Sequence, residues 1–291
     1  MNEMVRNFVR QQSWLDTLGA PLQKALTDFY HGRENESGPQ KELQNFLNGV
    51  WLGHPLHAIL TDVPVGAWTA TMVLDTIASL SGNDDLESAA DLTLATGLAA
   101  AVPTIASGLT DWMDTYGEEM TTGLMHGLTM TTSTLLYVGS LFARLAGGRA
   151  VGVALSNLGY AAMAAGAYLG GNEVYLHGYP INHAAFQHPP SSFTPVMPES
   201  DLPERTLTKG QAGNLSVLLV REGDQVYALD DTCVHAGCSL SGGTLEDYVV
   251  RCPCHGSEYD IRTGSVVNGP ATMPEPSYEA RIENGMIEIK G

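Results

Sequence analysis

Two short segments near the C-terminal end most constrain what this 291-residue chain can fold into. They are Cys233–Cys238, CVHAGC, and Cys252–Ser257, CPCHGS, and together they hold all four cysteines of the chain. A disulfide scaffold spreads its cysteines along a small secreted chain, so this clustering predicts a metal centre instead. Zinc sites usually pair two cysteines and then two histidines, whereas each segment here mixes both types, which leaves zinc as the disfavoured alternative.

The two segments resemble the ligand loops of Rieske-type domains. The resemblance implies an all-β domain at residues 199–291 that holds a 2Fe–2S cluster, with two thiolates on one iron and two neutral imidazoles on the other. Neutral ligands in place of anionic ones make such a cluster easier to reduce than an all-cysteine cluster. The expected ligands are Cys233, His235, Cys252 and His255.

The same resemblance assigns roles to the neighbouring residues. Cys238 and Cys254 match the positions that form a disulfide between the two loops in cytochrome bc-type Rieske proteins. Ser257 and Tyr259 match residues whose hydroxyls donate to a bridging sulfide and to a ligand cysteine sulfur, and such bonds raise the reduction potential. Residues 268–271, NGPA, resemble the proline loop that covers the cluster.

The part of the chain before residue 176 has a different character, with long stretches rich in Ala, Leu, Gly and Thr. Four segments look helical and apolar enough to cross a bilayer, which takes about 20 residues each. They are residues 57–80, 92–110, 120–143 and 150–172. Small residues repeat four apart at Ala162, Gly166 and Gly170, which suits close helix contacts in lipid. A soluble bundle with an alanine-rich interior is the alternative.

These observations predict a multidomain fold, in which an all-α, transmembrane four-helix bundle at residues 46–175 precedes the all-β domain. Residues 1–45 alternate apolar and polar positions at helical spacing and are expected to form an amphipathic segment. Residues 176–198 carry several prolines and are expected to form a linker without regular structure.

The start of the helical region also carries a resemblance. The sequence WLGHPLH at residues 51–57, followed by LTDVPVGAW and by His126 in the third helix, resembles a bacterial four-helix membrane domain of unknown function. That family often occurs fused to a Rieske ferredoxin domain. The resemblance covers about residues 46–175 and implies no established chemistry.

The expected location is the bacterial inner membrane, with several spans. Five Lys and Arg residues precede the first span and none follows the second, whereas none follows the first and two follow the third, and this difference favours a cytoplasmic N-terminus. Four spans would return the chain to the same side, so the Rieske domain is expected in the cytoplasm.

Several polar residues are expected at the same membrane side and are functional candidates, because polar groups inside a membrane are costly. His57 and His126 are the main candidates, with His54, Asp62 and Asp111 nearby in the expected topology. Two facing imidazoles could ligate a b-type haem, or they could hydrogen-bond a quinone. The third alternative is structural, with the histidines capping helices or bonding to Asp62 and Asp111.

The function expected from these features is membrane-anchored electron transfer. Single electrons would pass between a membrane centre, haem or quinone, and a redox partner protein. The alternative is a tethered ferredoxin that feeds a separate oxygenase or reductase, with the bundle as a plain anchor. In either case the chain is an electron carrier or a subunit rather than a stand-alone enzyme, and a homo-oligomer is compatible with the sequence. The net charge of −18 argues against nucleic acid as a partner.

Overall fold

The computed structural model describes residues 2–31 and 38–291, and the chain divides into two compact units. The helical unit comprises Met1–Lys41 and Leu56–His177, and the β unit comprises Glu42–Pro55 and Gly178–Gly291. Residues 1 and 32–37 of the expected N-terminal segment lie outside the described residues. The short stretch Glu42–Pro55 therefore precedes the long helices in the sequence but packs with the β unit.

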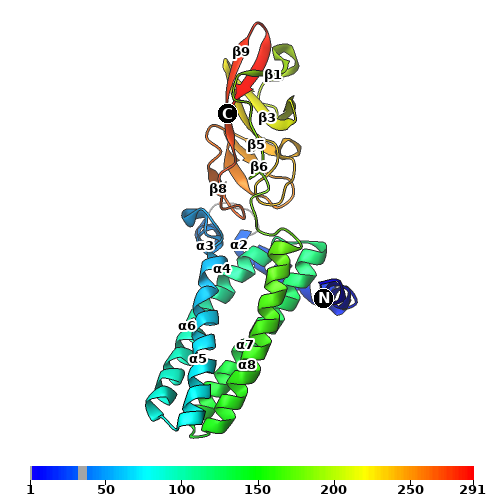
Figure 1. Cartoon of the computed structure of the whole chain (residues 1–291). Coiled ribbons are helices and arrows are strands. Elements are labelled where there is room, and N and C mark those ends of the chain that lie inside the picture. Colours follow the sequence, from blue (N-terminus) through cyan, green and yellow to red (C-terminus); the bar gives the residue numbers. More distant parts are fainter. Residues whose placement is uncertain (1, 32–37) are drawn as a thin grey trace. The chain divides into compact units, whose positions relative to one another are not determined.

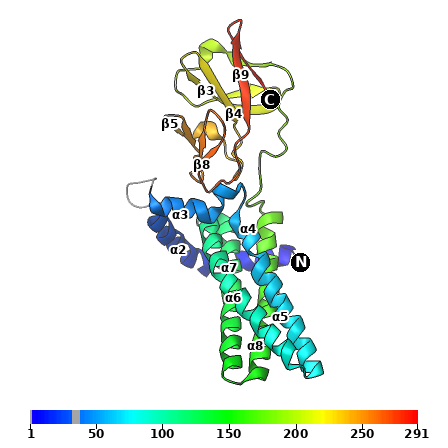
Figure 2. The ribbon, with the colours of Figure 1, turned by 90° about the vertical axis from the view of Figure 1, so that its left-hand side faces the viewer.

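The helical unit is built around four long helices. Its helices are α1 (Asn2–Arg10), α2 (Trp14–His31), α4 (Leu56–Leu60), α5 (Asp62–Ser81), α6 (Asp84–Trp112), α7 (Gly117–Leu145) and α8 (Arg149–Tyr175), and α3 (Pro39–Asn48) begins in this unit and ends in the other. Helix α5 packs against α6, and α7 packs against α8, as two hairpins (Figure 1 and Figure 2). Helices α1 and α2 pack on α7.

Three helical segments are long and apolar enough to cross a membrane among the residues that the structure describes. They are Leu56–Ser81, Asp84–Trp112 and Arg149–Tyr175. Helix α7, the third segment expected from the sequence, completes the bundle but is not among the three candidates. This unit is therefore a membrane region with three candidate spans, and the expectation of a helical region ahead of a β domain is confirmed.

The turn between α5 and α6 follows directly from the local sequence. Gly82 adopts φ 65°, a left-handed conformation that glycine accepts without strain, and it ends α5. The Asn83 side chain then accepts hydrogen bonds from the N–H groups of Asp85 and Leu86 and caps the start of α6. Acidic residues in the first turn of α6 also favour the positive end of the helix dipole.

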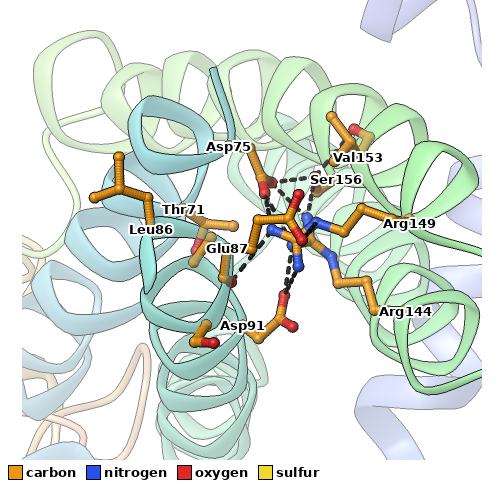
Figure 3. Close-up of polar contacts among 12 residues, drawn as sticks. Thr71, Asp75, Leu86, Glu87, Asp91, Arg144, Arg149, Val153 and Ser156 are labelled. Atoms are coloured by element: carbon orange, nitrogen blue, oxygen red, sulfur yellow. Dashed lines mark hydrogen bonds and ion pairs between the residues drawn. The ribbon is translucent and has the colours of Figure 1, made fainter. Parts of the chain in front are cut away.

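Buried charges join the four helices at this end of the bundle. Arg144 of α7 forms ion pairs with Asp75 of α5 and with Asp91 of α6, and Arg149 of α8 contacts the same two carboxylates (Figure 3). Only 2% of the Arg144 side chain and 1% of the Asp75 side chain are exposed. The Arg144 guanidinium also donates a hydrogen bond to the Ser156 hydroxyl oxygen at 3.1 Å. Burying such charges is tolerable only because each is paired.

The β unit contains two antiparallel sheets. Its strands are β1 (Thr194–Pro198), β2 (Thr208–Ala212), β3 (Leu215–Glu222), β4 (Gln225–Asp230), β5 (Thr244–Glu246), β6 (Val249–Arg251), β7 (Glu258–Asp260), β8 (Val266–Asn268), β9 (Ser277–Glu283) and β10 (Met286–Lys290). The larger sheet has the order β1-β10-β9-β4-β3-β2, and the smaller has the order β5-β6-β7-β8. Both expected ligand segments lie in loops that begin or end at the smaller sheet.

Strand β3 explains why a run of consecutive apolar residues forms a strand in this unit. Leu218 and Val220 point into one hydrophobic core, and Val217 and Leu219 point into another. Because successive side chains of a strand face opposite sides, a strand buried on both faces must be apolar throughout. The first of these cores also contains Cys233 and Cys252, so the larger sheet supports the candidate metal centre directly.

Candidate functional site

The two ligand loops share one backbone design. In each loop the first cysteine donates its N–H to the carbonyl oxygen five residues later, and the glycine four residues later donates back to that cysteine. These bonds are Cys233 to Cys238 (2.8 Å), Gly237 to Cys233 (2.8 Å), Cys252 to Ser257 (2.8 Å) and Gly256 to Cys252 (3.1 Å). Each loop is thus a closed turn that presents side chains from fixed positions.

Glycine is required in both turns, and a disulfide joins them. Gly237 adopts φ 75° and Gly256 adopts φ 74°, left-handed conformations that other residues rarely accept. Cys238 and Cys254 form a disulfide between the two loops. The disulfide expected from the sequence is therefore present in the structure, and it holds the two turns side by side.

The remaining two cysteines and the two histidines converge between the loops. Cys233 and Cys252 are free thiols, 1% and 2% exposed, and the rings of His235 and His255 have their centroids 4.9 Å apart. The Nδ1 atom of His235 is buried without a hydrogen-bond partner among the described residues. A buried nitrogen without a partner costs about 1–3 kcal/mol, which a bond to iron would offset.

The donor set suits a binuclear cluster. A Rieske cluster needs two protein ligands on each iron, two thiolates on one and two imidazoles on the other. The two free thiols, the two neighbouring histidines and the orphaned Nδ1 atom of His235 therefore fit a 2Fe–2S cluster.

The electrostatic environment keeps the imidazoles neutral. Burial lowers the pKa of His235 to about 3, and the nearby His255 lowers it further in the same direction. Burial also lowers the pKa of His255 below its ordinary value. Neutral imidazoles are the form that binds a metal, so the site favours the ligating state at neutral pH.

Both residues that were expected to tune the cluster lie at the ligand loops. The Tyr259 hydroxyl is 3.3 Å from the Cys233 sulfur, and burial raises the pKa of Tyr259, so the hydroxyl keeps a proton to donate. The Ser257 hydroxyl oxygen accepts a hydrogen bond from the Ala271 N–H at 3.0 Å, which leaves its own proton for another acceptor. Both side chains are fully buried.

Two acidic residues that precede the first ligand loop hold it in place, and the sequence reasoning missed them. Asp230 accepts hydrogen bonds from the Thr232 N–H (2.7 Å) and from the Tyr278 hydroxyl (2.9 Å). Asp231 accepts one from the Ser241 N–H (2.8 Å) and pairs with an exposed lysine. The signal available in the sequence was a pair of adjacent acidic residues, which lie at the end of an apolar strand and directly before a ligand segment.

A residue from far earlier in the chain holds the expected proline loop. Asn45 of α3 donates through Nδ2 to the Asn268 side chain at 2.8 Å and accepts the Gly269 N–H at 3.0 Å. The sequence had placed residue 45 at the end of an amphipathic N-terminal segment. Nothing in the local pattern around residue 45 indicates this long-range contact.

The helical unit contains the expected pair of histidines. The rings of His57 and His126 are perpendicular, with centroids 6.4 Å apart. His57 Nδ1 lies 2.9 Å from the Thr104 carbonyl oxygen, and His126 Nδ1 lies 2.7 Å from the Gly166 carbonyl oxygen. Because a carbonyl only accepts, each Nδ1 carries the proton, and each Nε2 keeps a lone pair.

Glycines on the neighbouring helices make room for the two rings. A Cβ added at Gly108 of α6 would lie 2.8 Å from the His57 ring, and one at Gly170 of α8 would lie 3.0 Å from the His126 ring. Both rings are partly exposed. Each imidazole is therefore seated against one helix, fixed in its tautomer, and still accessible at one side.

The other three candidate residues of the helical region are placed differently. Asp62 is exposed at the start of α5, and His54 is exposed in the β unit, outside the helical unit that holds His57. Asp111 is partly buried near the end of α6. The Nδ1 partners of the paired histidines are backbone carbonyls, where the structural alternative had named the carboxylates of Asp62 and Asp111.

Comparison with known proteins divides the chain in the same way. Residues 192–279 match the family model described as Rieske [2Fe-2S] domain, and residues 53–182 match "Predicted membrane protein (DUF2231)". Ferredoxin CarAc of Metapseudomonas resinovorans is 35% identical over 97 residues, which are 33% of this chain and 91% of the relative. The anthranilate 1,2-dioxygenase ferredoxin subunit of Burkholderia cepacia is 40% identical, over 27% of this chain and 72% of the relative.

Another relative is named as a subunit of a cytochrome complex. The cytochrome b6-f complex iron-sulfur subunit of Chlorobaculum tepidum is 33% identical, over 32% of this chain and 51% of the relative. Among solved structures, a complex of reduced oxygenase and oxidized ferredoxin in carbazole 1,9a-dioxygenase is 33% identical, with a TM-score of 0.32. That match covers 35% of this chain and 94% of the other.

Proposed function

Because the chain belongs to the Rieske [2Fe-2S] family and carries a predicted membrane domain, we propose that it is a membrane-anchored carrier of single electrons. The proposed ligands are Cys233, His235, Cys252 and His255. The observations that carry this assignment are the buried Nδ1 atom of His235, which has no hydrogen-bond partner among the described residues, and the two free, buried thiols, one in each loop. When bound, the cluster supplies one-electron redox chemistry at this site.

The surrounding residues have separate proposed roles. The Tyr259 hydroxyl donates to the Cys233 sulfur, and the Ser257 hydroxyl, which accepts from the Ala271 N–H, keeps its own proton for the cluster. Donors to ligand sulfur stabilise the reduced, more negative state and raise the potential. The Cys238–Cys254 disulfide keeps the two loops together in either redox state.

We further propose that the partner centre in the membrane, haem or quinone, binds at His57 and His126. Each Nδ1 is tied to a backbone carbonyl, which is how proteins usually orient a ligating histidine. The lone pair on each Nε2 can bind haem iron or accept a hydrogen bond from a quinol hydroxyl. Both rings are partly exposed, so such a group can reach them.

The test is a dithionite-reduced minus air-oxidised optical spectrum of the detergent-purified chain, with extraction and identification of bound quinone. Haem at the pair predicts sharp Soret and α bands that disappear in His57→Ala and in His126→Ala. Quinone predicts no such bands and a bound quinone that both variants lose. His54→Ala is the matched control, because His54 is exposed and belongs to the β unit. If neither group is found, the pair is structural and the membrane-centre proposal fails.

A tethered ferredoxin is the second candidate, and the relatives favour it. Two of them are named as ferredoxins, one of these being a dioxygenase subunit, at 35% and 40% identity. In that case the helical unit only anchors the cluster, which would feed a separate oxygenase or reductase. Retention of full electron transfer to such a partner by the His57→Ala/His126→Ala double variant would favour this candidate.

We propose that the chain lies in a bacterial inner membrane with the β unit in the cytoplasm. The excess of Lys and Arg before the first span supports this orientation. It requires an even number of crossings, so α7 would cross together with the three candidate spans. Reporter fusions at the C-terminus test the orientation, and a periplasmic signal would contradict it.

A further inference from the structure

A segment outside the Rieske family match lies against the first ligand loop of the β unit. The family match begins at residue 192, whereas residues 178–187 precede it and still pack within the β unit. His183 donates its N–H to the Val234 carbonyl oxygen at 3.1 Å, directly beside the ligand Cys233. Ala184 is 4% exposed and belongs to the core that contains Cys233 and Cys252.

The same segment brings a tyrosine onto one ligand histidine. The Tyr179 hydroxyl lies 3.3 Å from His235 Nε2, and the two rings meet edge to face with centroids 5.2 Å apart. Tyr179 is 7% exposed and His235 is 4% exposed, whereas His255 is only partly buried. The two ligand histidines therefore differ: one is covered by the chain itself, and the other reaches the surface of the β unit.

The direction of the hydrogen bond follows from the ligand assignment. If His235 binds iron through its orphaned Nδ1, its other nitrogen carries the proton and donates to the tyrosine oxygen. A hydrogen bond accepted from a ligand imidazole increases the electron density on that ligand, which favours the oxidised cluster. Tyr259 acts in the opposite sense, because its hydroxyl donates to the Cys233 sulfur and favours the reduced cluster.

We propose that Tyr179 is a positioning residue for the cluster, which accepts a hydrogen bond from ligand His235, lowers the reduction potential and closes that histidine to redox partners. The electron then enters and leaves at His255. This inference rests on the proposed ligand set but not on any centre in the helical unit. It also gives the segment that precedes the Rieske match a role beyond that of a linker.

The hydrogen bond is tested by redox titration of the full chain in detergent at one fixed pH, monitored by electron paramagnetic resonance. Tyr179→Phe should raise the midpoint potential and Tyr259→Phe should lower it, although both changes remove one buried hydroxyl. Tyr227→Phe is the control, because the Tyr227 ring packs on the Tyr248 ring, with centroids 6.1 Å apart, rather than on a ligand. The midpoint potential of this variant should equal that of wild type. An unshifted or lowered potential in Tyr179→Phe would overturn the inference.

The covering role is tested by the rate at which the reduced cluster gives one electron to ferricyanide, which becomes ferrocyanide. Tyr179→Ala should react several-fold faster than wild type because it uncovers His235, whereas Tyr179→Phe keeps the ring and should react no faster. If Tyr179→Ala reacts at the same rate as wild type, Tyr179 does not shield His235 from redox partners. A wild-type chain without a Rieske signal would instead refute the ligand assignment, and this inference with it.

Discussion

The buried ion pair between Arg144 and Asp75 gives a quantitative prediction for the helical unit. Replacing Arg144 with Met leaves the Asp75 carboxylate, 1% exposed, without its main partner. Breaking a buried pair from one side costs about 3–5 kcal/mol. Arg149 still reaches Asp75 Oδ1 at 2.8 Å, so we expect the lower end of that range, about 3 kcal/mol. At about 2–4 °C per kcal/mol, the melting temperature should fall by about 10 °C.

The assay is thermal unfolding of the detergent-purified chain, followed by the fluorescence of Trp68, which is buried in the bundle, together with the other tryptophans. The double variant Asp75→Asn/Arg144→Met leaves no uncompensated carboxylate at Asp75 and should recover most of the loss. Lys24→Met is the control, because Lys24 pairs with Asp28 at the surface, with 74% and 63% of the side chains exposed, and such pairs contribute about 0–1 kcal/mol. If Arg144→Met unfolds at the same temperature as Lys24→Met, or if the double variant is the least stable, the pair does not stabilise the bundle.

Three further predictions concern the connecting segments and the cluster. Burial raises the pKa of Asp114 to about 7 from an ordinary value near 4, so the free energy of unfolding should fall as pH rises from about 4 through 7. Asp114→Asn should flatten the pH dependence of the melting temperature between pH 5 and pH 8. The Cys238→Ser/Cys254→Ser variant loses a cross-link with a sequence separation of 16, and calorimetry should show a loss of about 3 kcal/mol in the oxidised protein. Cys233→Ser should abolish the Rieske paramagnetic signal, and a normal signal in that variant would refute its role as a ligand.

The helices of the bundle could be placed from the sequence, but their ends could not. Length and apolarity predicted a second helix at 92–110 and a fourth at 150–172. The observed helix α6 starts earlier, at Asp84, because Asn83 caps it, and it includes Asp91, which pairs with Arg149 at 2.7 Å. In a sequence, a charged residue at the end of an apolar segment indicates a loop. Only the fold shows that its partner lies on another helix.

The two ligand loops could be predicted because their spacing is local, whereas the contacts that support them could not. Each ligand loop is closed by hydrogen bonds within six residues, so the motif contains the information for its own geometry. Asn45 and Tyr179 reach the cluster loops from stretches outside the Rieske match, and no periodicity in the sequence marks them. Long-range contacts of this kind depend on how the chain returns to the β unit, which a single sequence does not specify.

The two hairpins of the bundle repeat the same contacts at the same spacing. His57 and Trp68 face α6 as His126 and Tyr137 face α8. The rings of Trp68 and Tyr137 stack with centroids 4.2 Å apart, and the rings of His57 and His126 form a second pair with centroids 6.4 Å apart. Asp75 follows Trp68 at the same spacing as Arg144 follows Tyr137, and Asp75 and Arg144 form the buried ion pair.

This repetition makes a sharp prediction about the histidine pair. Each imidazole bonds to a backbone carbonyl and lies against a glycine of the neighbouring helix, so a haem or quinone held by both should respond similarly to loss of either. We expect His57→Ala and His126→Ala to lower the bound cofactor by similar factors, and the double variant to lower it little further, because one remaining ligand is already insufficient. The measurement is cofactor content per chain, from the optical spectrum or by extraction. Loss on replacing one histidine with full retention on replacing the other would show that the site uses a single histidine and that the repeat is only architectural.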